Sequence, residues 1–205
     1  DAPDAGDYEI TVLDVGQGLA VIIRTEHHVL LYDTGPAFQG GGDAARLTVL
    51  PYLRSQGVAR LDRLVLSHGD ADHVGGLRSI LGELNVVSVL AGPSVNPMMG
   101  ARQCQSGDHW NWDHVEFSIL HPQAGSKDDS DNNLSCVLRV TNAGGSTLLL
   151  GDIESGAEQT LVERSLIQST KVVVAAHHGS RSSSTPELVN ATRLAGQQQW
   201  VIFSV

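Results

Sequence analysis

Short apolar stretches rich in Val, Ile and Leu alternate along the chain with polar, glycine-containing breaks. The pattern predicts strands at residues 9–15, 19–25, 29–32, 61–66, 86–90, 115–120, 134–140, 147–150, 171–176 and 200–205. Helices are predicted at residues 43–57, where Asp43 caps the start and Gly57 ends the helix, and at 74–84, 154–166 and 186–194. Strands lead into helices in both halves, and hairpins also occur in each half. We therefore expect an α/β fold of two mixed sheets packed together, with the helices outside.

The composition is that of a folded globular domain. Of the 205 residues, 41% are hydrophobic and only 18% are charged, which argues against disorder. No apolar stretch approaches the roughly 18 residues of a membrane-spanning helix, and no signal peptide is visible. We interpret residues 1–8 as a linker and residues 9–205 as one domain. Because the last predicted strand stops abruptly, we expect this domain to be truncated at its C-terminus.

Charge and cysteine content narrow the range of functions only partly. The formal net charge of −10 disfavours a broad electrostatic grip on nucleic acid, although bound cations would cancel acidic metal ligands locally. The two cysteines, Cys104 and Cys136, form no CxxC pair, so a metal site made only of sulfur ligands is excluded. They either form one disulfide in an oxidising compartment or are two small buried hydrophobic residues.

Reactive polar side chains follow four of the predicted strands directly. Asp33, His68, Asp152 and His177 each stand where an apolar stretch ends. In layered α/β folds the carboxyl ends of strands lie along one edge, where functional sites are usually built. The sequence therefore predicts one site at one edge of the molecule.

The densest group of candidate metal ligands is the run from Ser67 to His73. It places His68, Asp70, Asp72 and His73 within six residues, between a predicted strand and a predicted helix. Imidazole nitrogens combined with carboxylate oxygens suit zinc, manganese or iron. A solvated acidic loop is the alternative interpretation, and four metal-capable side chains at this spacing argue against it.

Two further motifs offer ligands from the second half of the chain. Asp152 follows Gly151 at the end of an apolar strand, where it either caps the next helix or bridges two metal ions. His177 and His178 are adjacent, and neighbouring side chains on extended backbone point in opposite directions. We therefore expect only one of them to reach a given metal, leaving the other to contact substrate or to orient the site.

Together these motifs resemble the ordered motifs of the metallo-β-lactamase superfamily. The stretches at residues 13–18, 67–76, 132–135 and 177–180 are similar, more narrowly, to the C-terminal domain of the ComEC/Rec2 DNA-internalisation proteins. The resemblance extends from about residue 9 to the end of the chain. It implies an αββα sandwich with two divalent metal ions, Mn²⁺ or Zn²⁺, held between the sheets.

Carried over by position, the resemblance implies a specific set of site residues. The metal ligands would be His68, Asp70, Asp72, His73, Asp152 and His178, with His177 as the alternative to His178. Asp33 and Asn133 would support the site. Asp70 stands where the superfamily usually has a second histidine, and Asn132 and Asn133 occupy the region of the usual third-motif histidine. Both changes favour harder cations, which makes manganese as plausible as zinc.

The resemblance also implies a function in natural transformation. The domain would be a metal-dependent deoxyribonuclease that degrades the strand that is not imported, acting on single-stranded DNA. Asp72, His177 and Ser180 would be its catalytic and phosphate-binding residues. Its partner would be the membrane channel portion of the same full-length protein, and the isolated domain would be a soluble monomer on the periplasmic or extracellular side of a bacterial inner membrane.

Two other functions are compatible with the sequence. A hydrolase of the same fold could act on a small ester, lactam or phosphodiester, and the acidic composition is compatible with a small substrate. A non-catalytic DNA-binding or assembly domain could retain the fold, although the intact set of candidate ligands argues against it.

The remaining histidines receive structural interpretations. His27 and His28 lie at a predicted hairpin turn and are expected to be solvated, and His121 precedes Pro122 at a chain corner. His109 and His114 flank Trp110 and Trp112 in a variable loop, where stacking of the tryptophans on substrate is the less favoured of two interpretations.

Overall fold

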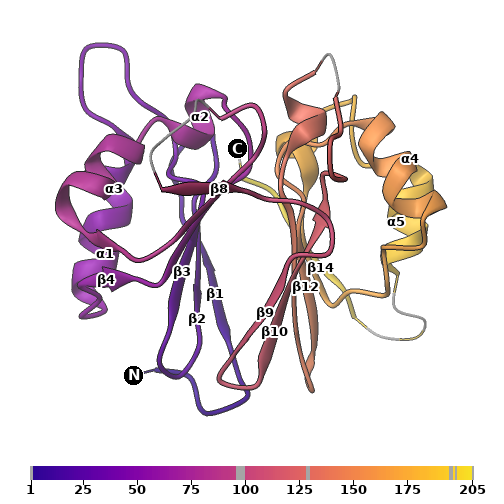
Figure 1. Cartoon of the computed structure of the whole chain (residues 1–205), viewed down its shortest axis with the longest axis horizontal. Coiled ribbons are helices and arrows are strands. Elements are labelled where there is room, and N and C mark those ends of the chain that lie inside the picture. Colours follow the sequence, from indigo (N-terminus) through magenta and orange to yellow (C-terminus); the bar gives the residue numbers. More distant parts are fainter. Residues whose placement is uncertain (1, 96–99, 128–129, 194–195, 197, 205) are drawn as a thin grey trace.

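Two six-stranded mixed sheets pack face to face, and helices cover their outer faces (Figure 1). The computed structural model describes residues 2–95, 100–127, 130–193, 196 and 198–204. Within those residues no helix is long and apolar enough to cross a membrane. The architecture is the αββα sandwich predicted from the sequence.

The first sheet is built from the N-terminal half of the chain. In spatial order its strands are β1 (Glu9–Val12), β2 (Val21–Arg24), β3 (Val29–Tyr32), β5 (Arg63–Leu66), β7 (Val89–Ala91) and β8 (Ala101–Gln103). The first three strands pair antiparallel, whereas β3, β5, β7 and β8 pair parallel. The short strands β4 (Arg60–Leu61) and β6 (Asn85–Val86) form a separate pair. Helices α1 (Leu50–Ser55) and α3 (Leu77–Glu83) cover the outer face of the first sheet, and α2 (Ala71–Val74) lies at the upper end of its strands in Figure 1.

The second sheet comes from the C-terminal half. In spatial order its strands are β14 (Trp200–Ile202), β13 (Val172–Val174), β12 (Gly145–Leu149), β11 (Val137–Asn142), β10 (Val115–His121) and β9 (His109–Trp112). Here β9 to β12 pair antiparallel, and β12, β13 and β14 pair parallel. Helices α4 (Ser155–Glu163) and α5 (Pro186–Thr192) lie on its outer face (Figure 1).

The central strands are buried on both faces, which explains why their sequences are continuously apolar. In β2, Val21 and Ile23 pack into the core between the sheets, and Ile22 between them packs into the core beneath the outer helices. In β5, Leu64 and Val65 divide between the same two cores. This layering holds the carboxyl ends of β3 and β5 side by side at one edge of the sandwich.

Several predicted elements are shorter or divided in the structure. The helix predicted from Asp43 consists of a helical turn at Ala45–Val49 followed by α1, and the helix predicted at residues 74–84 is divided into α2 and α3. The division falls at Gly75, where a β-carbon would overlap the backbone of Ala37, so a loop crosses the helix there. The apolar pattern missed β8, which is mostly polar, and β9, which alternates polar and aromatic residues. Leu194 and Val205, at the ends of two predicted elements, lie outside the described residues.

A disulfide joins the two sheets. Cys104 follows β8 in the first sheet, Cys136 precedes β11 in the second, and their Cα atoms are 6.1 Å apart. Both residues are buried in the core between the sheets. Of the two alternatives that the sequence left open, the structure shows the disulfide.

Candidate metal centre

Asp33 organises the loop that follows β5. Its backbone is left-handed, with φ of 58°, directly after β3. The buried carboxylate accepts hydrogen bonds from the amide and the hydroxyl of Ser67, each at 2.7 Å, and from Nδ1 of His73 at 2.7 Å. Because Nδ1 of His73 carries the donated proton, Nε2 is the nitrogen that points into the site.

The same hydroxyl orients His68. The Ser67 hydroxyl donates to Asp33, so it accepts a hydrogen bond from Nδ1 of His68, which lies 2.9 Å away. Nε2 of His68 is buried and has no hydrogen-bond partner among the described residues, while a carboxylate oxygen of Asp70 lies 3.5 Å from it. A buried nitrogen left without a hydrogen is a suitable donor to a metal ion, so this arrangement fits the metal that the sequence predicts.

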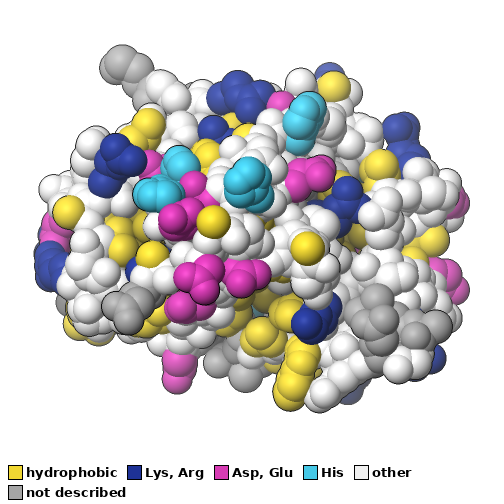
Figure 2. Space-filling model, turned by 90° about the horizontal axis from the view of Figure 1, so that it is seen from below, with side chains coloured by type: hydrophobic (Ala, Val, Ile, Leu, Met, Phe, Trp, Pro, Cys, Tyr) yellow, Lys and Arg dark blue, Asp and Glu magenta, His cyan; other side chains and the backbone are white. Residues whose placement is uncertain are grey.

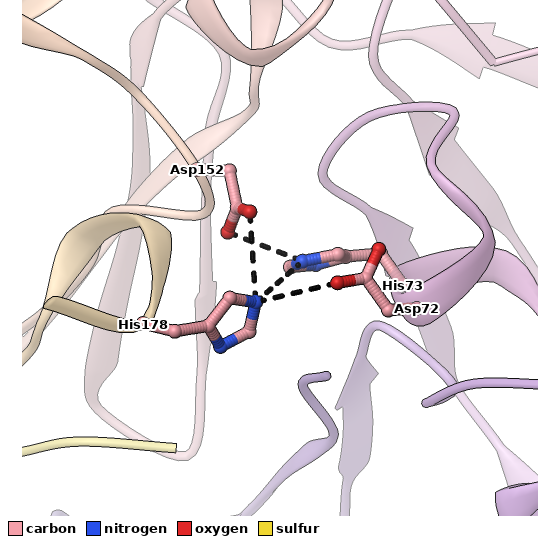
Figure 3. Close-up of side chains that lie close together, drawn as sticks. All are labelled: Asp72, His73, Asp152 and His178. Atoms are coloured by element: carbon pink, nitrogen blue, oxygen red, sulfur yellow. Dashed lines mark hydrogen bonds and ion pairs between the residues drawn. The ribbon is translucent and has the colours of Figure 1, made fainter. Parts of the chain in front are cut away.

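Four candidate ligands from opposite halves of the chain converge beside His68 (Figure 3). Nε2 of His73 lies 3.1 Å from Oδ1 of Asp152 and 3.3 Å from Nε2 of His178. Nε2 of His178 also lies 3.5 Å from Asp152 and 3.6 Å from Asp72. One potential ligand atom from each of the four residues lies within 4.8 Å of the others. A single ion could therefore bind all four.

Asp152 does not cap the helix that follows it. Its backbone amide donates to the Ser135 hydroxyl at 3.2 Å, and its buried carboxylate points towards the histidines (Figure 3). Helix α4 begins after Glu154, and the cap position makes no side-chain hydrogen bond. Of the two interpretations of Asp152, the helix cap is therefore wrong, and the carboxylate is available to metal ions.

The adjacent histidines separate in a way that the sequence did not predict. His177 and His178 both have left-handed backbone, with φ of 48° and 52°, so the argument from extended backbone was wrong. His178 enters the cluster because its Nδ1 donates to the carbonyl of Ser204 at 2.7 Å, which turns Nε2 towards Asp72. His177 lies at the rim, with Nε2 4.0 Å from Asp152 and Nδ1 3.5 Å from Glu154.

The other two predicted site residues lie outside the cluster. The Ser180 hydroxyl is 3.2 Å from that of Ser182, in the loop that follows the two histidines. Asn133 accepts a hydrogen bond from the amide of Glu154 at 2.9 Å, and its carbonyl accepts one from Nε2 of His121 at 2.7 Å. Asn133 thereby ties its own loop to the segment that follows Asp152.

The charges and hydrogen bonds within the cluster shift the pKa values of its side chains. Burial would lower the pKa of His73, but the charge of Asp33 and the hydrogen bond with Asp152 outweigh it and raise the pKa to about 10. A hydrogen bond from His178 lowers the pKa of Asp72 to about 2. Burial and the neighbouring His73 lower the pKa of His68. At neutral pH His73 is therefore protonated, Asp72 is ionised and His68 is neutral.

Three contacts of the site were not predicted from the sequence. Ser67 belongs to the recognised motif, and its position beside His68 was the available signal. Glu154 gave no motif signal, and the contact of Ser204 with His178 uses a backbone carbonyl, which any residue type has. The tryptophans do not belong to the site: Trp110 and Trp112 pack against Phe117, and the guanidinium of Arg63 covers the Trp110 ring at 4.1 Å.

The fold and the cluster of candidate ligands together are of the metallo-β-lactamase type. Residues 13–197 match the family model described as the metallo-β-lactamase superfamily, so the chain belongs to that superfamily. A solved B3 metallo-β-lactamase with an active-site glutamic acid superposes with a TM-score of 0.63 at 13% identity, covering 93% of this chain and 85% of that one. At such low identity this likeness shows the fold alone.

Closer sequence relatives are competence proteins of the ComEC/Rec2 family. The chain is 40% identical to competence protein ComA of Neisseria gonorrhoeae over 185 residues, which are 89% of this chain and 25% of that protein. It is 36% identical to recombination protein 2 of Haemophilus influenzae over 187 residues, 91% of this chain and 23% of that protein. The chain thus spans about a quarter of the length of these relatives. It is also 31% identical to a hydroxyacylglutathione hydrolase of Aeromonas hydrophila over 114 residues, 55% of this chain and 41% of that protein.

Proposed function

We propose that this domain is a metal-dependent nuclease that hydrolyses phosphodiester bonds of single-stranded DNA during natural transformation, degrading the strand that is not imported. The observation that carries the proposal is the convergence of Asp72, His73, Asp152 and His178 in a chain that is 40% identical to competence protein ComA. The buried, unpartnered Nε2 of His68 next to this cluster supports a second ligand group.

The ligand set divides into two groups. Asp72, His73 and His178 would hold one ion, and His68 with Asp70 would hold the other. Asp152 would join the first group, because its two oxygens face His73 and His178. With nitrogen and oxygen donors mixed, and aspartate at position 70, the set suits Mn²⁺ as well as Zn²⁺.

When bound, divalent ions supply Lewis acidity and lower the pKa of water towards neutrality. Asp72 would orient the attacking water. Its pKa of about 2 keeps the carboxylate ionised, so it accepts a hydrogen bond readily but is too weakly basic to hold a proton at neutral pH. Asp72 therefore fits an orienting role better than that of general base.

The rim of the site would bind the phosphate. His177 is half-buried beside Asp152, so its Nε2 can reach an anionic oxygen of a DNA strand at the edge of the sandwich. Glu154, 3.5 Å from Nδ1 of His177, would hold the ring in that orientation. Ser180 lies in the same loop and would donate its hydroxyl once it is released from Ser182.

The proposed setting is the outer side of a bacterial inner membrane. The domain would act as a monomer beside the channel portion of the same full-length protein. A buried disulfide between Cys104 and Cys136 is typical of periplasmic and extracellular proteins, and this supports placing the domain outside the cytoplasm.

A cleavage assay on a labelled single-stranded oligonucleotide tests the proposal. With Mn²⁺ or Zn²⁺ present we expect the wild-type domain to cleave and Asp72→Ala to lose roughly 100-fold or more of the rate. Asp4→Ala is the matched control, because Asp4 is exposed in the N-terminal segment, and it should retain full activity. Wild-type protein that binds metal but leaves DNA intact would overturn the nuclease proposal.

A second candidate function is hydrolysis of a small ester or thioester. The similarity to a hydroxyacylglutathione hydrolase and the net charge of −10 favour it. Assays with a thioester and with bis(p-nitrophenyl) phosphate separate the two functions: turnover of the thioester without DNA cleavage supports the small-substrate hydrolase. A protein that binds DNA but turns over none of these substrates would be a binding or assembly domain.

A further inference from the structure

A second group of metal-capable side chains lies at the end of the sandwich opposite the catalytic cluster. It forms where the turn between β2 and β3 meets the turn between β9 and β10, so it joins the two sheets. Figure 2 looks onto this end of the molecule and shows histidine side chains beside acidic ones. The group consists of Glu26, His27 and Asp113, and one potential ligand atom from each lies within 4.8 Å of the others.

The carboxylate of Asp113 is held in a fixed orientation. Its Oδ2 accepts hydrogen bonds from the Thr25 hydroxyl at 2.6 Å, the His27 amide at 2.9 Å and Nδ1 of His28 at 2.9 Å. These hydrogen bonds outweigh the effect of burial and hold the pKa of Asp113 below its usual range. These three donors all use Oδ2, whereas Oδ1 makes a separate contact with the His27 ring.

Oδ1 of Asp113 faces the ring of His27. Nδ1 of His27 lies 3.2 Å from Oδ1 of Asp113 and 3.6 Å from a carboxylate oxygen of Glu26. The His27 and Glu26 side chains are 66% and 39% exposed, so an ion can enter from solvent and keep water in its remaining coordination positions. Without a cation, the two carboxylates bring two negative charges to one small region.

We propose that Glu26, His27 and Asp113 bind a divalent transition-metal ion of the zinc class, separate from the catalytic centre. One imidazole nitrogen and two carboxylate oxygens form a ligand set that zinc, nickel and copper accept. The ion replaces the hydrogen bond between His27 and Asp113 and neutralises both carboxylates. It links the first sheet to the second at the end of the sandwich opposite the catalytic cluster.

Trp112 provides a local reporter for this site. The His28 ring stacks on the Trp112 ring with centroids 4.8 Å apart and planes 4° apart, and His28 itself is bonded to Asp113. Ni²⁺ bound beside Asp113 should therefore quench the fluorescence of Trp112. The catalytic cluster lies at the other end of the strands and should not affect this signal.

The test is a Ni²⁺ titration of the folded domain followed by tryptophan fluorescence. We expect saturable quenching in the wild type. In His27→Ala the affinity for Ni²⁺ should fall at least roughly ten-fold, because the metal site loses a contact. His114→Ala removes an exposed histidine from the same turn, and His178→Ala removes a catalytic-cluster ligand; both should quench like the wild type. Trp112→Phe should lose most of the saturable signal.

Three results would overturn the proposal. Quenching that does not saturate shows that no specific site exists near Trp112. Equal affinity in His27→Ala shows that His27 is not a ligand, and loss of quenching in His178→Ala assigns the signal to the catalytic cluster. Because His27 is largely exposed, the His27→Ala variant should fold, which its thermal unfolding curve verifies. Nuclease activity is not part of this readout, so its absence leaves the test intact.

Discussion

At the scale of single residues, the candidate metal centre depends on hydrogen bonds that fix which nitrogen each histidine presents. Asp33 holds His73, the Ser67 hydroxyl holds His68, and the Ser204 carbonyl holds His178. In each case Nδ1 is the bonded nitrogen, so all three Nε2 atoms are left to face the site. The fold therefore orients the candidate ligands without needing a metal ion.

Replacing Asp33 by asparagine tests this orientation. The amide cannot accept hydrogen bonds from Ser67 and His73 on both of its terminal atoms, so one buried donor loses its partner. We expect metal affinity to fall roughly 10- to 100-fold, measured by calorimetric titration with Zn²⁺. Asp4→Asn should bind as the wild type does. Unchanged affinity in Asp33→Asn would show that the carboxylate does not orient the ligands.

The raised pKa of His73 predicts proton release when metal binds. With a pKa of about 10, His73 is protonated at pH 7.5, and a metal ion at Nε2 must displace that proton. We expect metal affinity to rise with pH and the binding enthalpy to depend on the ionisation enthalpy of the buffer. A binding enthalpy that is the same in phosphate-free buffers of different ionisation enthalpy would contradict this prediction.

The same shift sets the pH dependence of stability without metal. The folded pKa of about 10 lies above the ordinary value of 6.5, so the proton on His73 stabilises the folded state fully below pH 6.5. This contribution is lost as pH rises from 6.5 through about 10. Urea unfolding of the metal-free protein should show it, and the loss should be smaller in His73→Gln.

The residue types of the cluster could be predicted from sequence, but the choice among neighbours could not. Asp72, His73 and Asp152 stand after strands that share an edge, and the structure brings them together. The selection of His178 over His177 depends on two consecutive left-handed residues and on a backbone carbonyl 26 residues away. Neither feature leaves a pattern in the side-chain sequence.

At the scale of elements, tertiary contacts decide where helices are interrupted and where edge strands form. The apolar pattern located the central strands because they are buried on both faces, but it joined α2 and α3 into one helix. It missed β9, in which tryptophans alternate with His109 and Asn111, because that edge strand is only partly buried. Polar edge strands and interruptions caused by a crossing loop depend on tertiary contacts, which a local pattern does not contain.

A pair of glycine substitutions tests the crossing between helix and loop. A β-carbon at Gly75 would overlap the backbone of Ala37, whereas one at Gly82 in α3 would meet nothing within 4 Å. We expect Gly75→Ala to lower the free energy of unfolding by about 1–3 kcal/mol through overpacking. Gly82→Ala should raise it by about 0.5–1 kcal/mol, because alanine favours the helix. Urea denaturation measures both, and a stabilising Gly75→Ala would contradict the packing seen here.

At the scale of the whole molecule, the two halves of the chain meet in the metal cluster and in the disulfide. Asp72 and His73 come from the first half, and Asp152 and His178 come from the second (Figure 3). Cys136 lies next to the same region, because its amide donates to the Ser67 carbonyl at 2.9 Å. Anything that separates the sheets should therefore weaken the metal centre as well.

Removal of the disulfide should destabilise the domain without changing its fold. The bond closes a loop with a sequence separation of 32 residues, which corresponds to about 3–4 kcal/mol from the lost entropy of the unfolded chain. We expect Cys104→Ala/Cys136→Ala to lose this amount in urea unfolding. The wild type in reducing agent should lose a similar amount, and a double variant as stable as the oxidised wild type would contradict the prediction.

The central claim is that side chains from both halves of the chain form one metal centre at the edge of the sandwich. Anomalous diffraction from crystals grown with Mn²⁺ or Zn²⁺ tests it most directly. The predicted result is a peak within coordination distance of Nε2 of His73 and of the Asp152 carboxylate, and its loss in Asp152→Ala crystals. A fully loaded crystal whose anomalous peaks all lie away from His73 and Asp152 would contradict the account.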